Sequence, residues 1–217
     1  MDRTPAPYKV TPQVRFSDIP KSDLKFHNQK IMTWVFGYGS LVWRPSFEHT
    51  ATLKCYVKDY ARVWTQGSTD HRGTPSHPGR TVTLERRVGA QTWGTAYKLP
   101  EDKREQIIEY LEVREKQYDV REVLPLFTEL SQGEAVAPAV EDALVYIATE
   151  ESANYLGVAT IDDLAMQMAT ARGPSGENAE YLYRLAEAMR EMGVLDKDLY
   201  RLEEKVKALK AQMPGQT

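Results

Sequence analysis

The run Trp34-Val35-Phe36-Gly37-Tyr38-Gly39-Ser40-Leu41 is an apolar segment with strand character that breaks into two glycines one residue apart, followed by a small hydroxyl residue. Glycine permits positive φ and close backbone approach, so consecutive N–H groups can converge on one point. A strand that delivers such a turn into a core predicts a cradle for a carboxylate or a developing oxyanion. A tight turn that binds nothing is the alternative, and glycine spacing by itself favours it.

Two better-known glycine motifs are excluded at this turn. A dinucleotide-binding fingerprint requires G-x-G-x-x-G at the start of a helix, but Val42 occupies the place of the third glycine. A nucleophile elbow requires G-x-S-x-G, but Ser40 is followed by Leu41 and Val42. The turn is therefore neither a known phosphate clamp nor a serine hydrolase elbow, and its chemical partner must lie elsewhere in the chain.

The length and composition are those of a soluble globular protein. The 217 residues suit one domain, or one domain with a helical appendage, and 41% apolar with 27% charged residues is enough to bury a core. A net charge of −3 predicts no general attraction for nucleic acid or anionic lipid. No apolar run approaches the roughly 18 residues of a membrane span. Residues 1–30 are polar and proline-rich, without a signal-peptide core, which predicts a flexible extension before a single domain over 31–213.

Cysteine and histidine usage argues against a metal site. Cys55 is the only cysteine, which excludes an internal disulfide and a multi-thiolate site and fits a reducing compartment such as the cytoplasm. The alternating residues around Cys55 predict a strand, so a buried structural role is expected for its thiol. No H-x-x-H or H-x-x-x-H spacing links the four histidines, His27, His49, His71 and His77. We expect neither a metal nor a cofactor.

The order of the predicted elements indicates an α+β fold rather than alternating βαβ units. Residues 31–99 show a short, alternating, β-rich pattern, interrupted by a long glycine- and proline-rich loop over 66–80 that suggests a lid or a rim. Pro125 cannot donate to a ladder, so its strand should lie at an edge or end there. The other predicted elements are a helix over 102–113, strands over 120–127 and 143–148, and helices over 161–171, 177–192 and 195–213, the last with a solvated charged face.

The helix over 102–113 carries the candidate base. Ile107 and Leu111 are four residues apart, and Glu115 follows four residues later, so a helix that continued that far would place this carboxylate on the buried stripe. A buried carboxylate is costly unless it is hydrogen-bonded or functional. Burial would raise its pKa, which makes a glutamate a competent base near neutral pH.

Periodicity leaves two alternatives open for this carboxylate. If the helix frays early, Glu115 pairs with Arg114 or Lys116 at the surface. Glu112 is the rival candidate for the base.

Other polar residues are weaker candidates for the site. Asp70-His71-Arg72 combines an acid, a base and a cation, but adjacent residues in a turn rarely form a relay, and turn structure is the preferred interpretation. Tyr118 and Tyr155 could orient a polar substrate, although buried tyrosines more often belong to the core.

These residues together resemble the ChaC family of glutathione-specific γ-glutamylcyclotransferases. The shared motifs occur in the family's order from about residue 33 to residue 210, and several long motifs in register are far more specific than a pair of glycines. Besides the opening run, they are Trp64-Thr65-Gln66-Gly67-Ser68-Thr69-Asp70-His71-Arg72-Gly73, Pro78-Gly79-Arg80, Trp93-Gly94, Tyr110-Leu111-Glu112-Val113-Arg114-Glu115, Asn154-Tyr155-Leu156-Gly157, Gly173-Pro174-Ser175-Gly176-Glu177-Asn178 and Glu180-Tyr181-Leu182.

The resemblance implies a fold and a set of site residues. The fold is a small, closed, mixed β-barrel with flanking helices and a helical C-terminal part, and we expect a monomer or weak dimer. The family's active-site glutamate falls on Glu115. Where relatives commonly have glycines before the next tyrosine, this chain has Lys116-Gln117 before Tyr118. The substrate-binding residues it implies are Val35, Phe36, Gly37, Tyr38, Gly39, Ser40 and Leu41, to which we add Tyr118 and Tyr155 as candidates.

The resemblance also implies cleavage of glutathione to 5-oxoproline and cysteinylglycine, a lyase reaction in which the substrate's α-amine attacks its own γ-carbonyl. Glu115 would take a proton from the α-ammonium and return one to the departing amine. Backbone N–H groups of residues 36–40 would hold the α-carboxylate or the tetrahedral oxyanion. Two alternatives stay open: a broader γ-glutamyl-amine or γ-glutamyl-amino-acid cyclotransferase, and a non-catalytic module that binds an acidic ligand.

Overall fold

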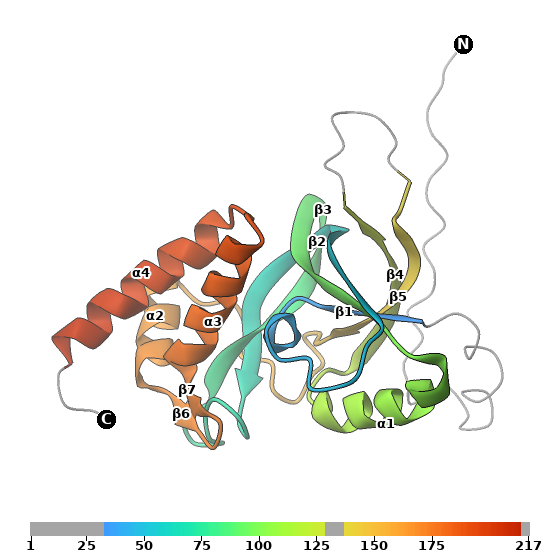
Figure 1. Ribbon diagram of the computed structural model, residues 1–217. Coiled ribbons are helices and arrows are strands. Elements are labelled where there is room, and N and C mark those ends of the chain that lie inside the picture. Colours follow the sequence, from blue (N-terminus) through green and yellow to red (C-terminus); the bar gives the residue numbers. More distant parts are fainter. Residues whose placement is uncertain (1–32, 129–136, 214–217) are drawn as a thin grey trace, which may run out of the picture.

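The computed structural model describes residues 33–128 and 137–213. The predicted N-terminal extension over 1–30 lies outside these residues. A β-barrel occupies the centre of the molecule, with helix α1 against one end and helices α2, α3 and α4 together on the other side (Figure 1). Among the helices of the described part, none is long and apolar enough to cross a membrane.

Five strands close the barrel in the order β1-β3-β2-β4-β5. Strand β1 runs parallel to β5 and every other pairing is antiparallel, so the barrel is mixed. Both the α+β class and the closed mixed barrel implied by the family resemblance are confirmed. The strands are β1 Trp34–Gly37, β2 Ala51–Ser68, β3 Gly79–Lys98, β4 Val120–Phe127 and β5 Val140–Ile147.

Strands β2 and β3 differ from the short strands predicted, because they are 18 and 20 residues long. A register shift between Lys58 and Tyr60 bends this pair around the barrel. Asp59, inside the shift, has φ 63°, and its Oδ1 accepts a hydrogen bond from the Gly89 N–H at 2.7 Å. In the sequence, such an irregularity within a continuous strand looks like the end of one strand and the start of another.

The helices lie close to their predicted ranges. Helix α1 begins after a single 3₁₀ turn at Glu101–Lys103 and ends one residue before Glu115. Pro125 falls at a register shift between Leu124 and Leu126, where β4 loses regular pairing. The helices are α1 Arg104–Arg114, α2 Ile161–Thr170, α3 Asn178–Glu191 and α4 Lys197–Gln212, and a small hairpin of β6 Arg172–Gly173 and β7 Gly176–Glu177 precedes α3.

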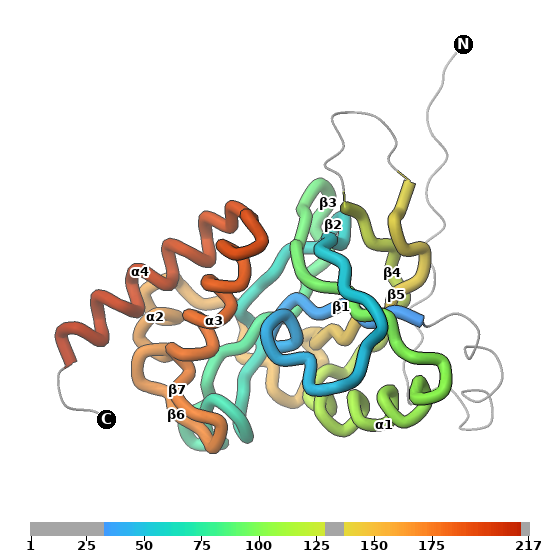
Figure 2. The backbone as a smooth tube through the Cα atoms, viewed as in Figure 1, coloured from blue at the N-terminus to red at the C-terminus, as the bar shows by residue number. Residues whose placement is uncertain are grey.

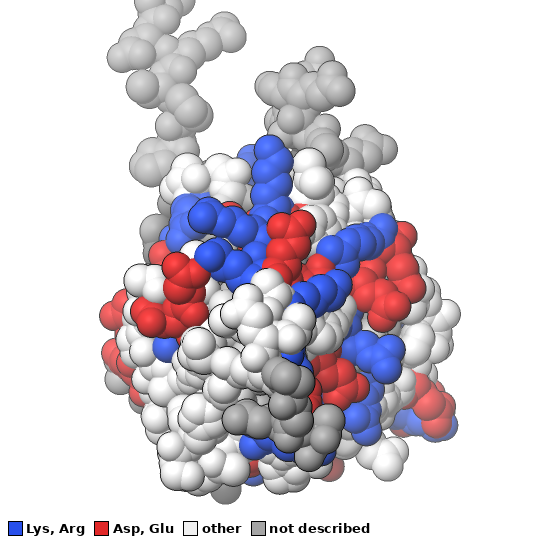
Figure 3. All heavy atoms as spheres, turned by 90° about the vertical axis from the view of Figure 1, so that its left-hand side faces the viewer, with Lys and Arg blue, Asp and Glu red and all other residues white. Residues whose placement is uncertain are grey.

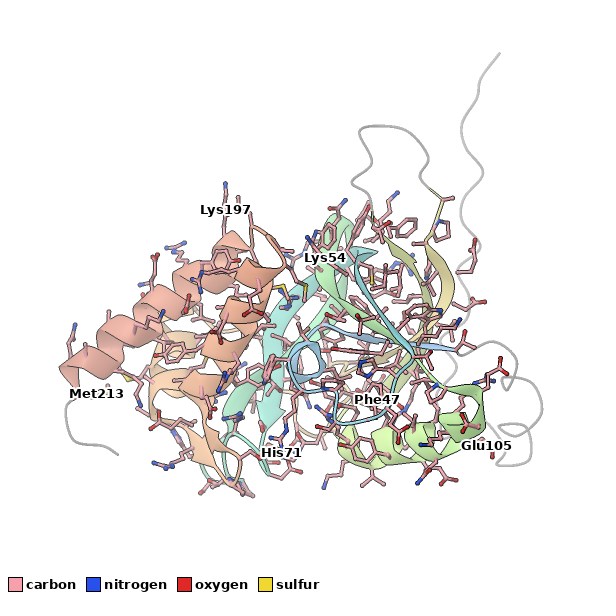
Figure 4. The ribbon with its side chains drawn as sticks, in the orientation of Figure 1. Phe47, Lys54, His71, Glu105, Lys197 and Met213 are labelled. Carbon is pink, nitrogen blue, oxygen red and sulfur yellow. The ribbon has the colours of Figure 1, made fainter. Side chains whose placement is uncertain are left out.

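The long loop predicted over 66–80 is shorter in the structure. Residues 66–68 continue β2 and pair with 79–81 of β3, so only 69–78 connect the strands. The connection is held against the β6–β7 hairpin and helix α2: the His71 carbonyl accepts from the Ser175 N–H at 2.9 Å, and Gln167 Nε2 donates to the Pro78 carbonyl at 2.7 Å. Figure 4 shows His71 at this end of the molecule, beside the β6–β7 hairpin. These contacts make the connection a fixed rim.

The apolar core joins the barrel to the C-terminal helices. One cluster of buried side chains includes Val82 and Leu84 of the barrel together with Leu182 and Leu185 of α3. Burying each such side chain contributes about 1.5–3 kcal/mol. Helix α4 adds three buried apolar residues, Leu199, Leu202 and Val206. Its other face is charged as predicted, and Figure 3 shows lysine, arginine and acidic residues interspersed on the face formed by the helices.

Candidate active site

The glycine-rich run forms a strand followed by a tight turn. Val35 and Phe36 are buried in β1, and the chain then leaves the sheet and forms a 3₁₀ turn at Ser40–Val42. Glycine is required at position 37 because an added Cβ would lie 2.4 Å from the Leu41 Cβ. In the backbone tube of Figure 2, this turn curls beside α3 in front of the barrel. The contact is direct, since the Trp43 ring meets the Tyr181 ring at 5.3 Å between centroids.

Two arginines fix the turn and leave some of its N–H groups available. Arg62 Nε donates to the Tyr38 carbonyl at 3.1 Å, and Arg114 Nη2 donates to Ser40 Oγ at 3.2 Å. Within the described residues, the N–H groups of Gly39 and Ser40 have no hydrogen-bond acceptor. A turn held from outside with unpaired N–H groups is suited to bind negative charge.

Glu115 is the C-cap residue of α1 and is buried, which is one of the two alternatives that periodicity left open. Ile107 and Leu111 are buried, and Glu115 caps the helix with its N–H donating to the Leu111 carbonyl at 2.8 Å. The helix ends at Arg114, but the surrounding fold keeps Glu115 only 9% exposed. Its Oε1 is buried and has no hydrogen-bond partner. Arg114 Nε lies 3.0 Å away but without hydrogen-bond geometry, so the contact is an ion pair only.

The turn and this carboxylate line one cavity of about 20 Å³. Val35 does not line it; it lies behind the turn in the core cluster that contains Leu41 and Leu111. Tyr155 is not brought to the cavity either, because it pairs with Gln66 and its hydroxyl lies 3.4 Å from Glu150. The lining residues are Phe36, Gly37, Tyr38, Gly39, Ser40, Leu41, Glu115, Tyr118 and Tyr146.

Burial dominates the electrostatics of this cavity. It raises the pKa of Glu115, while the positive charges of Arg114 and then Arg121 oppose the rise. Burial also raises the pKa of the phenols of Tyr38, Tyr118 and Tyr181, so they stay neutral at any physiological pH. The Tyr118 hydroxyl donates to the Val82 carbonyl at 3.0 Å. Glu115 is therefore the one carboxyl group among the residues that line the cavity, and its pKa lies above the ordinary glutamate value.

Glu112, the rival base, is occupied by two partners. Its carboxylate pairs with Arg121 at 2.7 Å and accepts a hydrogen bond from the Tyr146 hydroxyl at 2.9 Å. Tyr146 in turn lines the cavity, and its carbonyl accepts from the Tyr38 hydroxyl at 2.6 Å. Glu112 supports the cavity wall from behind and does not face into the cavity.

Several residues at the site carry little or no signal in the sequence. Tyr146 lies in a predicted strand, but no local pattern distinguishes it from a core tyrosine. Tyr181 was signalled only by the motif Glu180-Tyr181-Leu182; an added Cβ on Gly39 would lie 2.8 Å from its hydroxyl. Arg62 carried no signal at all, because its partners are distant in the sequence.

The second cavity is a larger cleft of about 440 Å³ between the 69–78 connection and the segment that follows Glu115. Lys116 and Asp70 form an ion pair of 3.2 Å there, and Gln117 Nε2 donates to Asp70 Oδ1 at 2.5 Å. The Asp70-His71-Arg72 triplet forms no relay, since Arg72 instead pairs with Glu180 at 2.7 Å. The lining residues are Thr69, Asp70, Lys116, Gln117, Asp119, Glu151, Ser152, Ala153 and Asn154.

Cysteine and histidine form no reactive cluster in the described residues. Cys55 is buried in β2, and burial raises the pKa of its thiol to about 12. His71 contacts Ser175 Oγ at 3.2 Å, and His77 contacts Thr170 Oγ1 at 3.1 Å. Over residues 33–128 and 137–213, no group of three or more histidine, cysteine or acidic side chains is arranged to hold a metal ion.

Comparison with known proteins identifies close relatives over most of the chain. A family model described as ChaC-like protein matches residues 33–209. γ-Glutamylcyclotransferase 2-3 of Arabidopsis thaliana is 48% identical over 80% of this chain and 88% of its own length. Human glutathione-specific γ-glutamylcyclotransferase 1 is 38% identical over 87% of this chain and 81% of its own. The crystal structure of a yeast γ-glutamyl cyclotransferase specific to glutathione superimposes with a TM-score of 0.75 at 28% identity, covering 84% of this chain and 98% of that one.

Proposed function

The chain belongs to the ChaC-like family, and on that premise we propose that it is a γ-glutamylcyclotransferase that cleaves glutathione to 5-oxoproline and cysteinylglycine. The observation that carries the proposal is that Glu115 and the turn at residues 37–40 line one cavity, with the Glu115 Oε1 buried and ion-paired to Arg114. The names of the relatives support glutathione as the substrate.

The reaction needs one group that accepts and then donates a proton. The α-amine of the substrate forms a bond to its own γ-carbonyl carbon, and the bond from that carbon to the cysteine nitrogen breaks. Glu115 takes a proton from the α-ammonium and returns one to the departing nitrogen. Its raised pKa brings the carboxyl closer to the working pH, which suits both transfers.

The turn supplies the electrostatic half of the site. Side chains that line the cavity include no lysine or arginine, and we therefore assign the substrate's negative charge to backbone N–H groups. The N–H groups of Gly39 and Ser40 are the donors available for the α-carboxylate or for the oxyanion. Folding of the γ-glutamyl chain between the turn and Glu115 brings amine and carbonyl together, which supplies proximity.

The aromatic residues shape the cavity. Tyr118 and Tyr146 form walls, since their hydroxyls are engaged by the Val82 carbonyl and by Glu112. The proposed site therefore keeps Tyr118, gains Tyr146 and leaves out Tyr155, which lies away from the cavity. The proposal also includes a cytoplasmic location, no cofactor or metal, and a monomeric or weakly dimeric state.

Incubation with glutathione and detection of 5-oxoproline tests the function directly. We expect release of 5-oxoproline by the wild-type protein, with a kcat/KM for glutathione well above that for γ-glutamyl-alanine. Equal turnover of the two substrates would favour a broader γ-glutamyl-amino-acid cyclotransferase. Glutathione left unchanged over hours by purified, folded protein would contradict the proposal.

A further inference from the structure

Arg62, on β2, is a buried charged residue that the proposed chemistry does not use. Its side chain is 6% exposed. Nε donates to the Tyr38 carbonyl at 3.1 Å, Nη2 to the Trp93 carbonyl at 2.5 Å, and Nη1 to Asp196 Oδ2 at 2.6 Å. One guanidinium thus ties the turn after β1 to strand β3 and to the start of helix α4.

The contact with Tyr38 orients the peptide group between Tyr38 and Gly39. In a trans peptide, the C=O of one residue and the N–H of the next point in opposite directions. The hydrogen bond that holds the Tyr38 carbonyl toward Arg62 therefore directs the Gly39 N–H away from Arg62. A charged donor on the carbonyl also polarises the peptide, which strengthens the N–H as a donor. Gly39 lines the cavity that contains Glu115.

Asp196 supplies the opposite charge that a buried guanidinium requires. It is the N-cap residue of α4, where its side chain accepts from the Leu199 N–H at 3.1 Å. The helix begins beside it at Lys197, which Figure 4 labels at the upper end of α4. The position of Arg62, and with it that of the turn, depends on a residue supplied by the C-terminal helices.

We propose that Arg62 is a positioning residue for the substrate-binding turn: held by Asp196 of α4, it directs the Gly39 N–H at the substrate's α-carboxylate. The proposal rests on the proposed function, since it requires that the turn bind a γ-glutamyl group. The α-carboxylate is the negatively charged group of the γ-glutamyl part, and no lysine or arginine is among the residues that line the cavity to pair with it. This contact exists in the bound substrate and in the transition state alike, so its loss raises KM and leaves kcat nearly unchanged.

Arg62→Lys is the sharpest test. Lysine keeps the charge that pairs with Asp196 but places a methylene where the Arg62 Nε–H donates to Tyr38. We expect a rise in KM for glutathione of about tenfold, the size of one lost charge-assisted hydrogen bond. We expect kcat to stay within about twofold of wild type. Asp196→Asn retains a helix cap but removes the counter-charge, and it should raise KM in the same direction.

Glu203→Gln provides a matched control on the same helix. Glu203 is 3% exposed and pairs with Arg190 and Lys207 without contacting the turn. Its replacement should lower the melting temperature and leave KM unchanged. An unchanged KM in Arg62→Lys, or an equal rise in Glu203→Gln, would overturn the positioning role.

A second measurement does not depend on catalysis. The amide resonance of Gly39 in nitrogen-15 NMR spectra should shift in Arg62→Lys and stay in place in Glu203→Gln. If the wild-type protein released no 5-oxoproline, the proposed function would fail, while this resonance would still report whether Arg62 holds the turn. A Gly39 resonance at the same position in the wild type and in Arg62→Lys would show that Arg62 does not fix the turn.

Discussion

The guanidinium of Arg114 lies 3.0 Å from the carboxylate of Glu115, its neighbour in the chain. Both side chains are largely buried, and the two effects on Glu115 oppose each other. Removal from water raises its pKa and is the larger effect, whereas the charge of Arg114 lowers it. The net result is that the pKa of Glu115 lies above the ordinary glutamate value, and the charge of Arg114 limits the size of this rise.

The pH dependence of activity should follow this balance. Glu115 must lose its proton to act as a base, so the acid limb of kcat/KM should lie above pH about 4.3, the ordinary glutamate value. Arg114→Gln removes the opposing charge, so the pKa of Glu115 rises further and the acid limb moves to higher pH. Profiles of kcat/KM against pH measure the shift. Arg184→Gln, at an exposed ion pair on α3, is the control that should not move the limb; an unmoved limb in Arg114→Gln would contradict the coupling.

Glu115→Gln should separate activity from stability. Loss of the base should reduce release of 5-oxoproline by about 10²–10⁴-fold. Because the pKa of Glu115 is raised in the folded state, the folded protein binds this proton more tightly than the unfolded chain, and stability falls as pH rises through that interval. Glutamine carries no charge, so at neutral pH the variant should unfold at the same temperature as the wild type or at a higher one. This difference in melting temperature should vanish below pH about 4, where Glu115 is protonated in both the folded and the unfolded wild type. A variant with near-normal turnover would place the base elsewhere.

Glu112→Gln tests whether Glu112, the alternative candidate, is the base instead of Glu115. Glu112 already pairs with Arg121 at 2.7 Å and holds the Tyr146 hydroxyl, so it is not poised to move a proton. We expect most of kcat to remain, with a loss of no more than about tenfold that reflects a less rigid wall. Assays run beside Glu115→Gln give the comparison. If Glu112→Gln instead lost as much activity as Glu115→Gln, the assignment of the base would reverse.

The parts of the site that the sequence predicted are local ones. The spacing of Glu115 from Ile107 and Leu111 made it a candidate for a buried position, and this relation holds although the helix ends at Arg114. Periodicity left Glu112 as a rival, and the family resemblance singled out Glu115. The turn became a candidate because two closely spaced glycines permit close backbone approach and convergent N–H groups. Both inferences use only residues a few positions apart, where the backbone itself determines proximity.

The parts that escaped depend on contacts between distant segments. Arg62 and Asp196 are 134 positions apart, and the hydrogen bond from Tyr38 to Tyr146 spans 108. No periodic pattern in either segment specifies its partner, because the pairing is set by barrel closure and helix docking. The closed barrel itself was implied by family resemblance, whereas periodicity indicated only the α+β class.

Gly39→Ala should impair the turn through a specific clash. An added Cβ would lie 2.8 Å from the Tyr181 hydroxyl and 3.0 Å from Val82 Cγ2. Overpacking of this kind costs about 1–3 kcal/mol, and the displaced turn should lower kcat/KM. Tyr181→Phe removes the hydroxyl that the added Cβ would meet, so the double variant should recover part of the lost stability and part of the lost kcat/KM. A double-mutant cycle on melting temperature and kcat/KM measures this coupling, and strictly additive effects would show that the clash is relieved elsewhere.

Cys55→Ala should leave the activity intact. The thiol is buried, its Sγ donates to the Leu53 carbonyl at 3.4 Å, and burial raises its pKa to about 12. The thiol therefore stays protonated at pH 8, and the thiolate is the reactive form. An aromatic disulfide reagent should therefore label the native protein very slowly and the urea-unfolded protein at once. Rapid labelling of the native protein that abolishes 5-oxoproline release, while the Cys55→Ala variant keeps its activity under the same treatment, would place this thiol within reach of the active site.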